Sequence, residues 1–295
     1  MEPGLTAGGL MYRWLFIAVA GLWLVAMAAL IRRDVWPAWT AQDAPRMEAS
    51  QLGKPGVARK EQFSIFDADN KPIGTAWGEV QVEENRTATV TSMILIDGMK
   101  LLPPVRVESR TEFDEKGELS DFDLSVYGVP MTIISVHGER RGIYFPCEMH
   151  FGPMHRQANL EMSASRMIGE SLRPFAVLPK LHVGQSWRMQ VLDPLSAVQG
   201  GKSEFRSVVA EVTGKEFITT EVSGRVECFV VEIRGQQAKA WVGPEGRVLR
   251  QEVAVPGLKR LALQEARYDD EARKEAVHRV RMMPKAEKGQ HERSN

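Results

Sequence analysis

The feature that most constrains this chain is an uncharged apolar run of 17 residues, Leu15–Ile31. As a helix that rises about 1.5 Å per residue, the run covers about 26 Å, close to the thickness of a bilayer's hydrocarbon core. Trp14 precedes the run, where membrane proteins carry interfacial aromatic residues, and Arg32 and Arg33 end it. The run predicts a single-pass transmembrane helix, a signal-anchor that attaches the protein to the cell membrane.

Cleavage and orientation of this segment stay open on the sequence alone. Ala26-Met27-Ala28 fits the A-x-A pattern of a cleavage site, so a removed signal peptide is the alternative to a retained anchor. One arginine, Arg13, precedes the span and two follow it, which favours a cytoplasmic C-terminal part. A short tail, one span and a linker more often deliver a domain outward. We therefore expect the C-terminal domain to be extracytoplasmic, either periplasmic or extracellular.

Four segments are predicted along the chain. We expect an N-terminal tail and anchor at 1–33, a linker at 34–62, a β-rich domain at 63–267, and a short helix with a disordered tail at 268–295. The chain has 38 basic and 38 acidic residues, so its formal net charge is zero. Nucleic-acid-binding proteins normally carry a basic excess, so we expect no nucleic acid partner.

The β-rich domain is predicted from its hydrophobic pattern. Apolar and polar residues alternate with a period of two in stretches such as 78–82 and 87–91, and turn residues separate such stretches. Short, regularly spaced strands of this kind are typical of an antiparallel meander curled into a sandwich or a partly open barrel. The alternation also places Trp77, Trp187 and Trp241 in the core. The predicted fold class is mainly β, with one N-terminal transmembrane helix and a short C-terminal helix.

Two further patterns concern the hairpins and the C-terminal end. Residues 113–119 and 242–248 share the same spacing of apolar residues around a glycine, which fits either two similar halves or two ordinary hairpins. Asp269–Met283 is predicted to be a helix, because its acidic residues come first and its basic residues later. Ala272 and Ala276, with Val280 and Met283, form a narrow apolar stripe. We therefore expect this helix to dock weakly on the β domain.

The densest group of metal-binding side chains lies in the segment Cys147–His155. Its thiol, thioether and imidazole groups suit a soft metal such as copper, with Cys147, His150 and His155 as the candidate metal ligands. Two nearby prolines predict an irregular loop. A loop that buries its sulfur-containing side chains and exposes its histidines explains the same pattern without a metal.

Cys147 has two other interpretations. It could act as a nucleophile with His150 or His155 as base, although no helix is predicted directly after it to stabilise a thiolate. It could also form a disulfide with Cys228 outside the cytoplasm, whereas a free buried cysteine explains Cys228 equally well. The chain contains no G-x-S-x-G, Walker, dinucleotide-binding or H-E-x-x-H motif. We assign no catalytic residue and no cofactor.

Two short segments carry a resemblance to known proteins. Val183-Gly-Gln-Ser-Trp187 and Trp241-Val-Gly-Pro-Glu-Gly246-Arg-Val-Leu249 resemble a Gly-x-x-Trp strand and a Trp-x-x-x-x-Gly-x-Val hairpin. Both are typical of bacterial membrane-anchored extracytoplasmic β-rich domains of unknown function, and the resemblance covers Leu178 to Val255. It implies an envelope location and a fold distantly similar to the half-barrels of lipoprotein carriers, which hold an acyl chain. The chain lacks a lipobox cysteine near the span, so it does not resemble a lipoprotein.

The predicted function is binding or scaffolding at the cell envelope, with an apolar ligand or an envelope protein as partner. We favour binding over catalysis because no nucleophile, base and orienting residue combine at a convincing spacing. The alternative is a Cys/His-dependent enzyme or a copper-binding protein centred on Cys147–His155.

Overall fold

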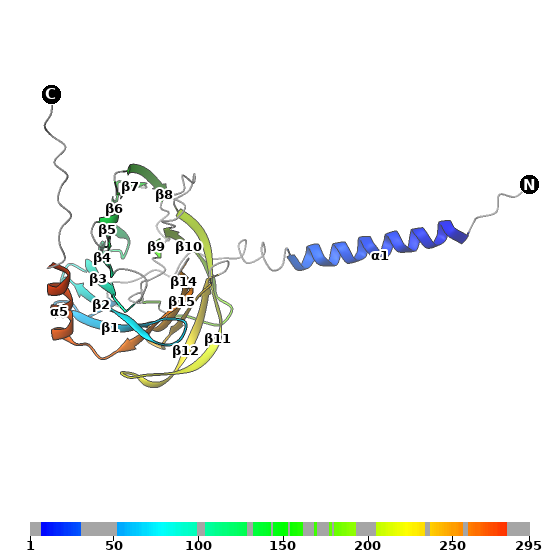
Figure 1. Cartoon of the computed structure of the whole chain (residues 1–295). Coiled ribbons are helices and arrows are strands. Elements are labelled where there is room, and N and C mark those ends of the chain that lie inside the picture. Colours follow the sequence, from blue (N-terminus) through cyan, green and yellow to red (C-terminus); the bar gives the residue numbers. More distant parts are fainter. Residues whose placement is uncertain are drawn as a thin grey trace, which may run out of the picture. The chain divides into compact units, whose positions relative to one another are not determined.

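The computed structural model describes residues 7–30, 52–98, 104–128, 132–142, 144–152, 154–161, 168–169, 177–178, 180–192, 205–233, 237–255 and 259–281. The chain divides into two compact units, residues 1–42 and residues 43–295. The first unit contains one long helix, and the second contains a large curled sheet and a short helix (Figure 1).

The helix of the first unit is α1 (Ala7–Leu30), which contains 24 residues and covers nearly all of the predicted segment Leu15–Ile31. Seven of its large apolar side chains are exposed: Phe16, Val19, Leu22, Trp23, Leu24, Val25 and Leu30. Within the described residues, no helix meets the length and apolar character that crossing a membrane requires. The predicted helix is confirmed, whereas its placement across a membrane is not shown.

The second unit is built on one sheet of 15 strands. They are β1 (Arg59–Phe66), β2 (Pro72–Val82), β3 (Ala88–Ile96), β4 (Val105–Phe113), β5 (Leu119–Gly128), β6 (Thr132–Glu139), β7 (Tyr144–Phe151), β8 (Met154–Glu161), β9 (Ile168–Gly169), β10 (Ser186–Leu192), β11 (Phe205–Thr220), β12 (Gly224–Ile233), β13 (Ala238–Val242), β14 (Val248–Val255) and β15 (Lys259–Ala266). All neighbouring strands are antiparallel except β9 and β10.

The strand order is that of a meander with one long-range junction. Strands that follow one another in sequence lie side by side, except for β8 and β9, and β1 also pairs with β15, so that Gln62 lies opposite Ala266. In the described part of the chain, β8 and β9 form the two edges and the sheet is not closed. The predicted antiparallel meander is therefore confirmed, and its curvature is visible in Figure 1.

Four hairpins share one turn geometry: β1–β2, β2–β3, β4–β5 and β13–β14. In each, the first turn residue donates its N–H to the carbonyl four positions later, and the fourth residue donates back to the first. The fourth residue has a positive φ, 58° at Asn70, 67° at Arg86, 75° at Gly117 and 84° at Gly246. A left-handed residue after a type I turn is a common hairpin connection. The similarity of 113–119 to 242–248 thus reflects a turn that two other hairpins also contain.

Apolar side chains fill the inner face of the sheet. The largest cluster joins β1, β2, β3 and β15 and contains Phe63, Ile65 and Leu263, each at most 1% exposed. Leu52 belongs to the same cluster, and β1 begins at Arg59. The packed part of the chain therefore starts inside the segment 34–62 that was predicted as a linker.

The short helix α5 (Asp270–Arg281) covers the opposite face of β2 and β3. Ala276 packs with Trp77, Met93 and Leu95, and the main chain N–H of Ala272 is capped by Asp269 Oδ1 at 2.9 Å. Two of the four predicted stripe residues, Ala272 and Ala276, thus make the contact, with Val277 beside them. The side chains of Val280 and Met283 lie outside the described residues.

The three tryptophans predicted to be in the core are buried, with exposed fractions of 4% for Trp77, 2% for Trp187 and 6% for Trp241. Trp187 packs in a cluster on β10–β14, while Trp241 packs against Cys228, Val230 and Leu249. The indole Nε1 of Trp241 donates a hydrogen bond of 2.7 Å to Glu216 Oε2.

A buried group of charges lies where β1, β15 and the β11–β12 turn meet. Glu61 and Glu265 are 8% and 5% exposed, and both contact the guanidinium group of Arg247. Thr220 Oγ1 and Ser223 Oγ donate to Glu265 Oε2 at 3.0 and 2.6 Å. The tip of the β11–β12 hairpin is thereby fastened to β15.

Candidate metal site

The segment Cys147–His155 forms the central part of the β7–β8 hairpin, so the predicted irregular loop is wrong. Gly152, with a φ of 55°, begins the short connection between the two strands. Pro146 pairs with Asn159 of β8, whereas the pairing of β7 with β6 begins only at Cys147. A proline is tolerated at this position because the strand has a paired neighbour on one side only.

Strand alternation separates the three candidate ligands that the sequence grouped together. Cys147 and Met149 point into the core, with exposed fractions of 1% and 0%, whereas Glu148 and His150 point outward. His155 of β8 lies directly opposite His150. The structure therefore brings His150 and His155 together and replaces the Cys147 thiol with the Glu148 carboxylate.

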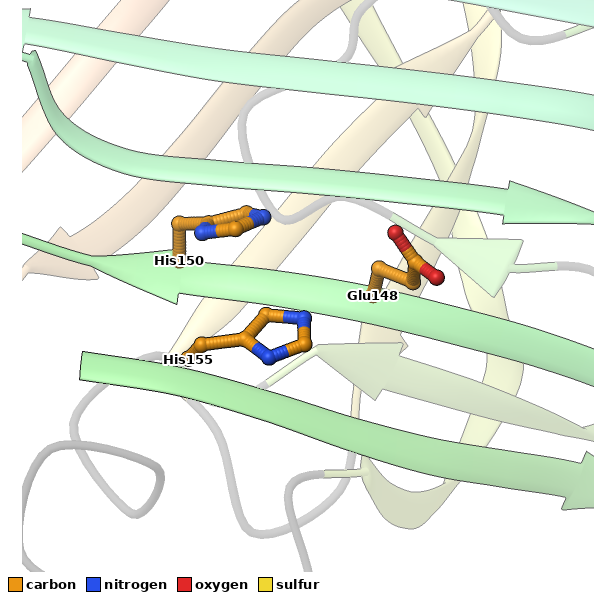
Figure 2. A group of neighbouring side chains, drawn as sticks. All are labelled: Glu148, His150 and His155. Atoms are coloured by element: carbon orange, nitrogen blue, oxygen red, sulfur yellow. The ribbon is translucent and has the colours of Figure 1, made fainter.

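The three exposed side chains converge above the outer face of the hairpin. The ring centroids of His150 and His155 are 4.6 Å apart, with an angle of 31° between the ring planes. One potential ligand atom each from Glu148, His150 and His155 lies within 4.8 Å of the other two. Figure 2 shows the three side chains on the same face of the two strands.

This arrangement can hold a metal ion once the side chains rotate. Imidazole nitrogen and carboxylate oxygen bind zinc at about 2.0–2.2 Å, so two ligands of a tetrahedral ion lie about 3.3–3.6 Å apart. The ligand atoms lie within 4.8 Å of one another, and exposed side chains can rotate to close the remaining distance. Three protein ligands would leave one position of a tetrahedral shell for another group.

A histidine and a carboxylate lie beside the group on the same outer face. His137 of β6 lies opposite Glu148, and Asp123 of β5 lies opposite His137. The Nδ1 of His137 is 2.8 Å from Asp123 Oδ1, and this hydrogen bond raises the pKa of His137. Asp121, Asp123 and His137 also place one potential ligand atom each within 4.8 Å of one another. Burial, with repulsion from Asp123, raises the pKa of Asp121.

Cys147 and Cys228 are not joined by a disulfide and lie in different apolar clusters, so the pairing considered between them is wrong. Burial raises the pKa of the Cys228 thiol to about 11. The Cys147 thiol contacts the carbonyl of Phe145 at 3.7 Å and belongs to the cluster on β5–β7. Buried structural cysteines of this kind are inert.

Glu148, His137 and Asp123 were not predicted from the sequence as neighbours of His150 and His155. The signal for Glu148 was its spacing of two residues from His150, which places both side chains on one face of a strand. The prediction of a loop concealed that signal. His137 and Asp123 come from β6 and β5, so their place beside Glu148 depends on strand register.

Comparison with known proteins gives structural similarities only, since the chain matches no protein-family model and no curated protein. A β-barrel-like protein of the domain of unknown function DUF1849 from Brucella abortus is 11% identical, with a TM-score of 0.43. The match covers 74% of this chain and 100% of that one. A DUF1089 family protein from Pseudomonas aeruginosa is 17% identical, with a TM-score of 0.35, over 62% of this chain and 90% of that one. Neither similarity supports an inference about function, and membrane anchoring is not shown.

Proposed function

We propose that this protein binds a divalent transition-metal ion at Glu148, His150 and His155. The observation that carries the proposal is the convergence of these three side chains, whose potential ligand atoms lie within 4.8 Å of one another. The register of the hairpin holds His150 opposite His155, so the backbone positions both imidazoles before an ion arrives. An ion can enter directly from solvent because all three side chains are exposed.

The imidazole and carboxylate ligands favour Zn²⁺ or Cu²⁺ over the soft metal ion that the sequence predicted. Imidazole and carboxylate ligands suit these divalent ions, whereas Cu⁺ prefers thiolate and thioether ligands. The Cys147 thiol is on the core side of β7 and cannot join a site on the outer face without unfolding the strand. The same burial removes support for Cys147 as a nucleophile.

The proposal includes attachment to the cell membrane through α1, with the sheet and its metal site on the extracytoplasmic side. The exposed apolar residues of α1, from Phe16 to Leu30, fall on every side of the helix at 3.6 residues per turn. A helix that is apolar all round is typical of a buried or membrane-spanning segment. With this location, the proposed role is that of a metal-binding protein of the cell envelope.

A metal count on the purified full-length protein tests the binding site. We expect about one equivalent of Zn²⁺ to remain after dialysis of the wild type and much less than one in His150→Asn/His155→Asn, because two of the three ligands are lost. The matched control is His182→Asn/His278→Asn, which removes two exposed histidines elsewhere and should keep the ion. Full retention by the first variant would overturn the proposal.

A reporter fusion after Asn295 tests the location independently. Alkaline phosphatase fused there should be active and a cytoplasmic fluorescent reporter dark, and deletion of residues 7–30 should release the protein from the membrane fraction. The opposite pattern of reporter activity would contradict the extracytoplasmic placement without affecting the metal count.

A further inference from the structure

Four side chains on the outer face lie directly opposite one another across four adjacent strands. In order they are Asp123 on β5, His137 on β6, Glu148 on β7 and Gln157 on β8. Directly opposed residues on antiparallel strands have Cβ atoms about 4.5–5.5 Å apart, so each side chain lies beside the next. Gln157 Nε2 donates to Glu148 Oε1 at 3.4 Å. This row of side chains therefore connects the proposed metal ligand Glu148 on β7 to His137 on β6.

The hydrogen bond to Asp123 orients the His137 ring. Its Nδ1 lies 2.8 Å from Asp123 Oδ1, on the side of β6 that faces β5. The two nitrogens of an imidazole point in diverging directions, so Nε2 is directed away from Asp123. When the carboxylate accepts the Nδ1–H, Nε2 keeps the lone pair that a metal ion needs.

We propose that His137 is a fourth ligand of the metal site, bound through Nε2, and that Asp123 is the residue that positions it. This inference rests on the proposed metal binding by Glu148, His150 and His155. A carboxylate that accepts the second N–H of a ligating histidine is a recurring feature of metal sites, and it fixes the tautomer and the ring orientation. His137 has such a carboxylate partner in Asp123.

The strand geometry makes this ligand reachable. β6 is adjacent to β7, where His137 lies directly opposite Glu148 and diagonally from His150. His155 lies on β8, two strand spacings of about 4.8 Å from β6, so the His137 ring must turn towards β7 to share an ion with it. The side chains of His137 and Asp123 are 52% and 50% exposed, which leaves them free to turn towards the ion together. Three imidazoles and one carboxylate complete a tetrahedral shell without a solvent ligand.

Another arrangement uses the same residues differently. Asp121, Asp123 and His137 could hold a second, separate ion, because their potential ligand atoms also lie within 4.8 Å of one another. In that case Asp123 would ligate an ion instead of holding His137. The two arrangements differ in stoichiometry, one ion against two.

A Co²⁺ titration of the full-length protein tests the inference, because tetrahedral Co²⁺ absorbs visible light much more strongly than five- or six-coordinate Co²⁺. We expect one equivalent and intense bands in the wild type. His137→Asn should still bind one ion, but 10–100-fold more weakly and with reduced band intensity. Asp123→Asn should weaken binding by about 10-fold while the bands stay intense, as expected for a residue that acts through the ligand. Glu139→Gln, which changes an exposed carboxylate on β6, the strand of His137, should match the wild type.

Three results would overturn the inference. His137→Asn could leave both affinity and band intensity unchanged, or the wild type could bind two equivalents and lose one in His137→Asn. The third is a loss of Co²⁺ affinity in Glu139→Gln as large as that in Asp123→Asn, which would indicate a general effect of removing negative charge. Failure of the proposed function gives a different result, because then His150→Asn/His155→Asn binds Co²⁺ as well as the wild type does. Circular dichroism and the melting temperature of each variant show that the sheet is folded.

Discussion

Arg247 places its Nη2 2.6 Å from Glu265 Oε1, in a region where Glu265 is almost inaccessible to solvent. The Nε of the same guanidinium group lies 3.0 Å from Glu61 Oε1. One cation therefore contacts two buried carboxylates, one from β1 and one from β15, at the junction that joins the two ends of the domain, and Arg59 contacts Glu61 as well.

Replacing Arg247 should strongly destabilise the domain. Arg247→Met leaves Glu61 and Glu265 without this partner, and an uncompensated buried charge costs about 3–5 kcal/mol. The free energy of unfolding, measured with urea at pH 7, checks this value. Arg260→Met is the control, because Arg260 pairs with Glu252 at the surface and such pairs contribute at most about 1 kcal/mol. Equal losses in the two variants would contradict the assigned role of Arg247.

The contribution of Glu61 to stability should decrease as pH rises. Burial raises the pKa of Glu61 above its ordinary value of 4.5, despite the opposing effects of Arg59 and Arg247. Between 4.5 and the raised value, the folded protein binds more protons than the unfolded chain, so this part of the stability is lost across that window. The unfolding free energy of the wild type minus that of Glu61→Gln should therefore be largest at low pH. If this difference in unfolding free energy instead grows with pH, attraction to Arg59 and Arg247 outweighs burial in setting the pKa of Glu61.

The shared hairpin turn predicts opposite effects at two equivalent positions. Gly246→Ala forces a Cβ into the left-handed region, where φ is 84°, and should cost about 1–2 kcal/mol. Arg86→Gly removes a Cβ from the same conformation, where φ is 67°, and should stabilise the protein by up to about 1 kcal/mol. Thermal unfolding of the two single variants measures both signs. Destabilisation by Arg86→Gly would show that the Arg86 side chain stabilises the protein by more than the left-handed backbone at this residue destabilises it.

Disrupting the contact of α5 should expose Trp77. Ala276 is 5% exposed against Trp77, Met93 and Leu95, so Ala276→Lys inserts a long charged side chain into a packed contact. We expect a loss of about 1–3 kcal/mol and greater quenching of tryptophan fluorescence by acrylamide. His278→Lys, at an exposed position of the same helix, should leave both measurements unchanged. Unchanged quenching in Ala276→Lys would mean that the helix can shift and still cover Trp77.

Local patterns predicted the strands and turns, because period-two alternation is a property of neighbouring residues. The same alternation located Trp77, Trp187 and Trp241, which are all buried. The β1–β15 pairing was not predictable in this way, since its partners are far apart in the sequence and nothing local fixes their register.

The candidate site was predicted in part, and the error has a structural cause. Cys147 and His150 are three positions apart, an odd spacing that puts them on opposite faces of one strand. His150 and His155 are close for another reason, since a short connection folds β8 back on β7. Treating the segment as a loop removed both constraints, so sequence proximity was taken for spatial proximity.

The single pairing between the two ends of the sheet has a consequence for how the chain folds. Apart from β8 and β9, strands that follow one another in sequence are paired, so two antiparallel meanders, β1–β8 and β10–β15, can form by closing shorter loops. Only the docking of β1 on β15 closes a loop as long as the domain. The conformational entropy lost in closing this loop must be offset before the contacts between β1 and β15 stabilise the fold. Arg247 and Glu61 meet at that junction, so we expect their contact to form late in folding. A permuted chain that links residue 266 to residue 59 would make this closure local and speed up folding.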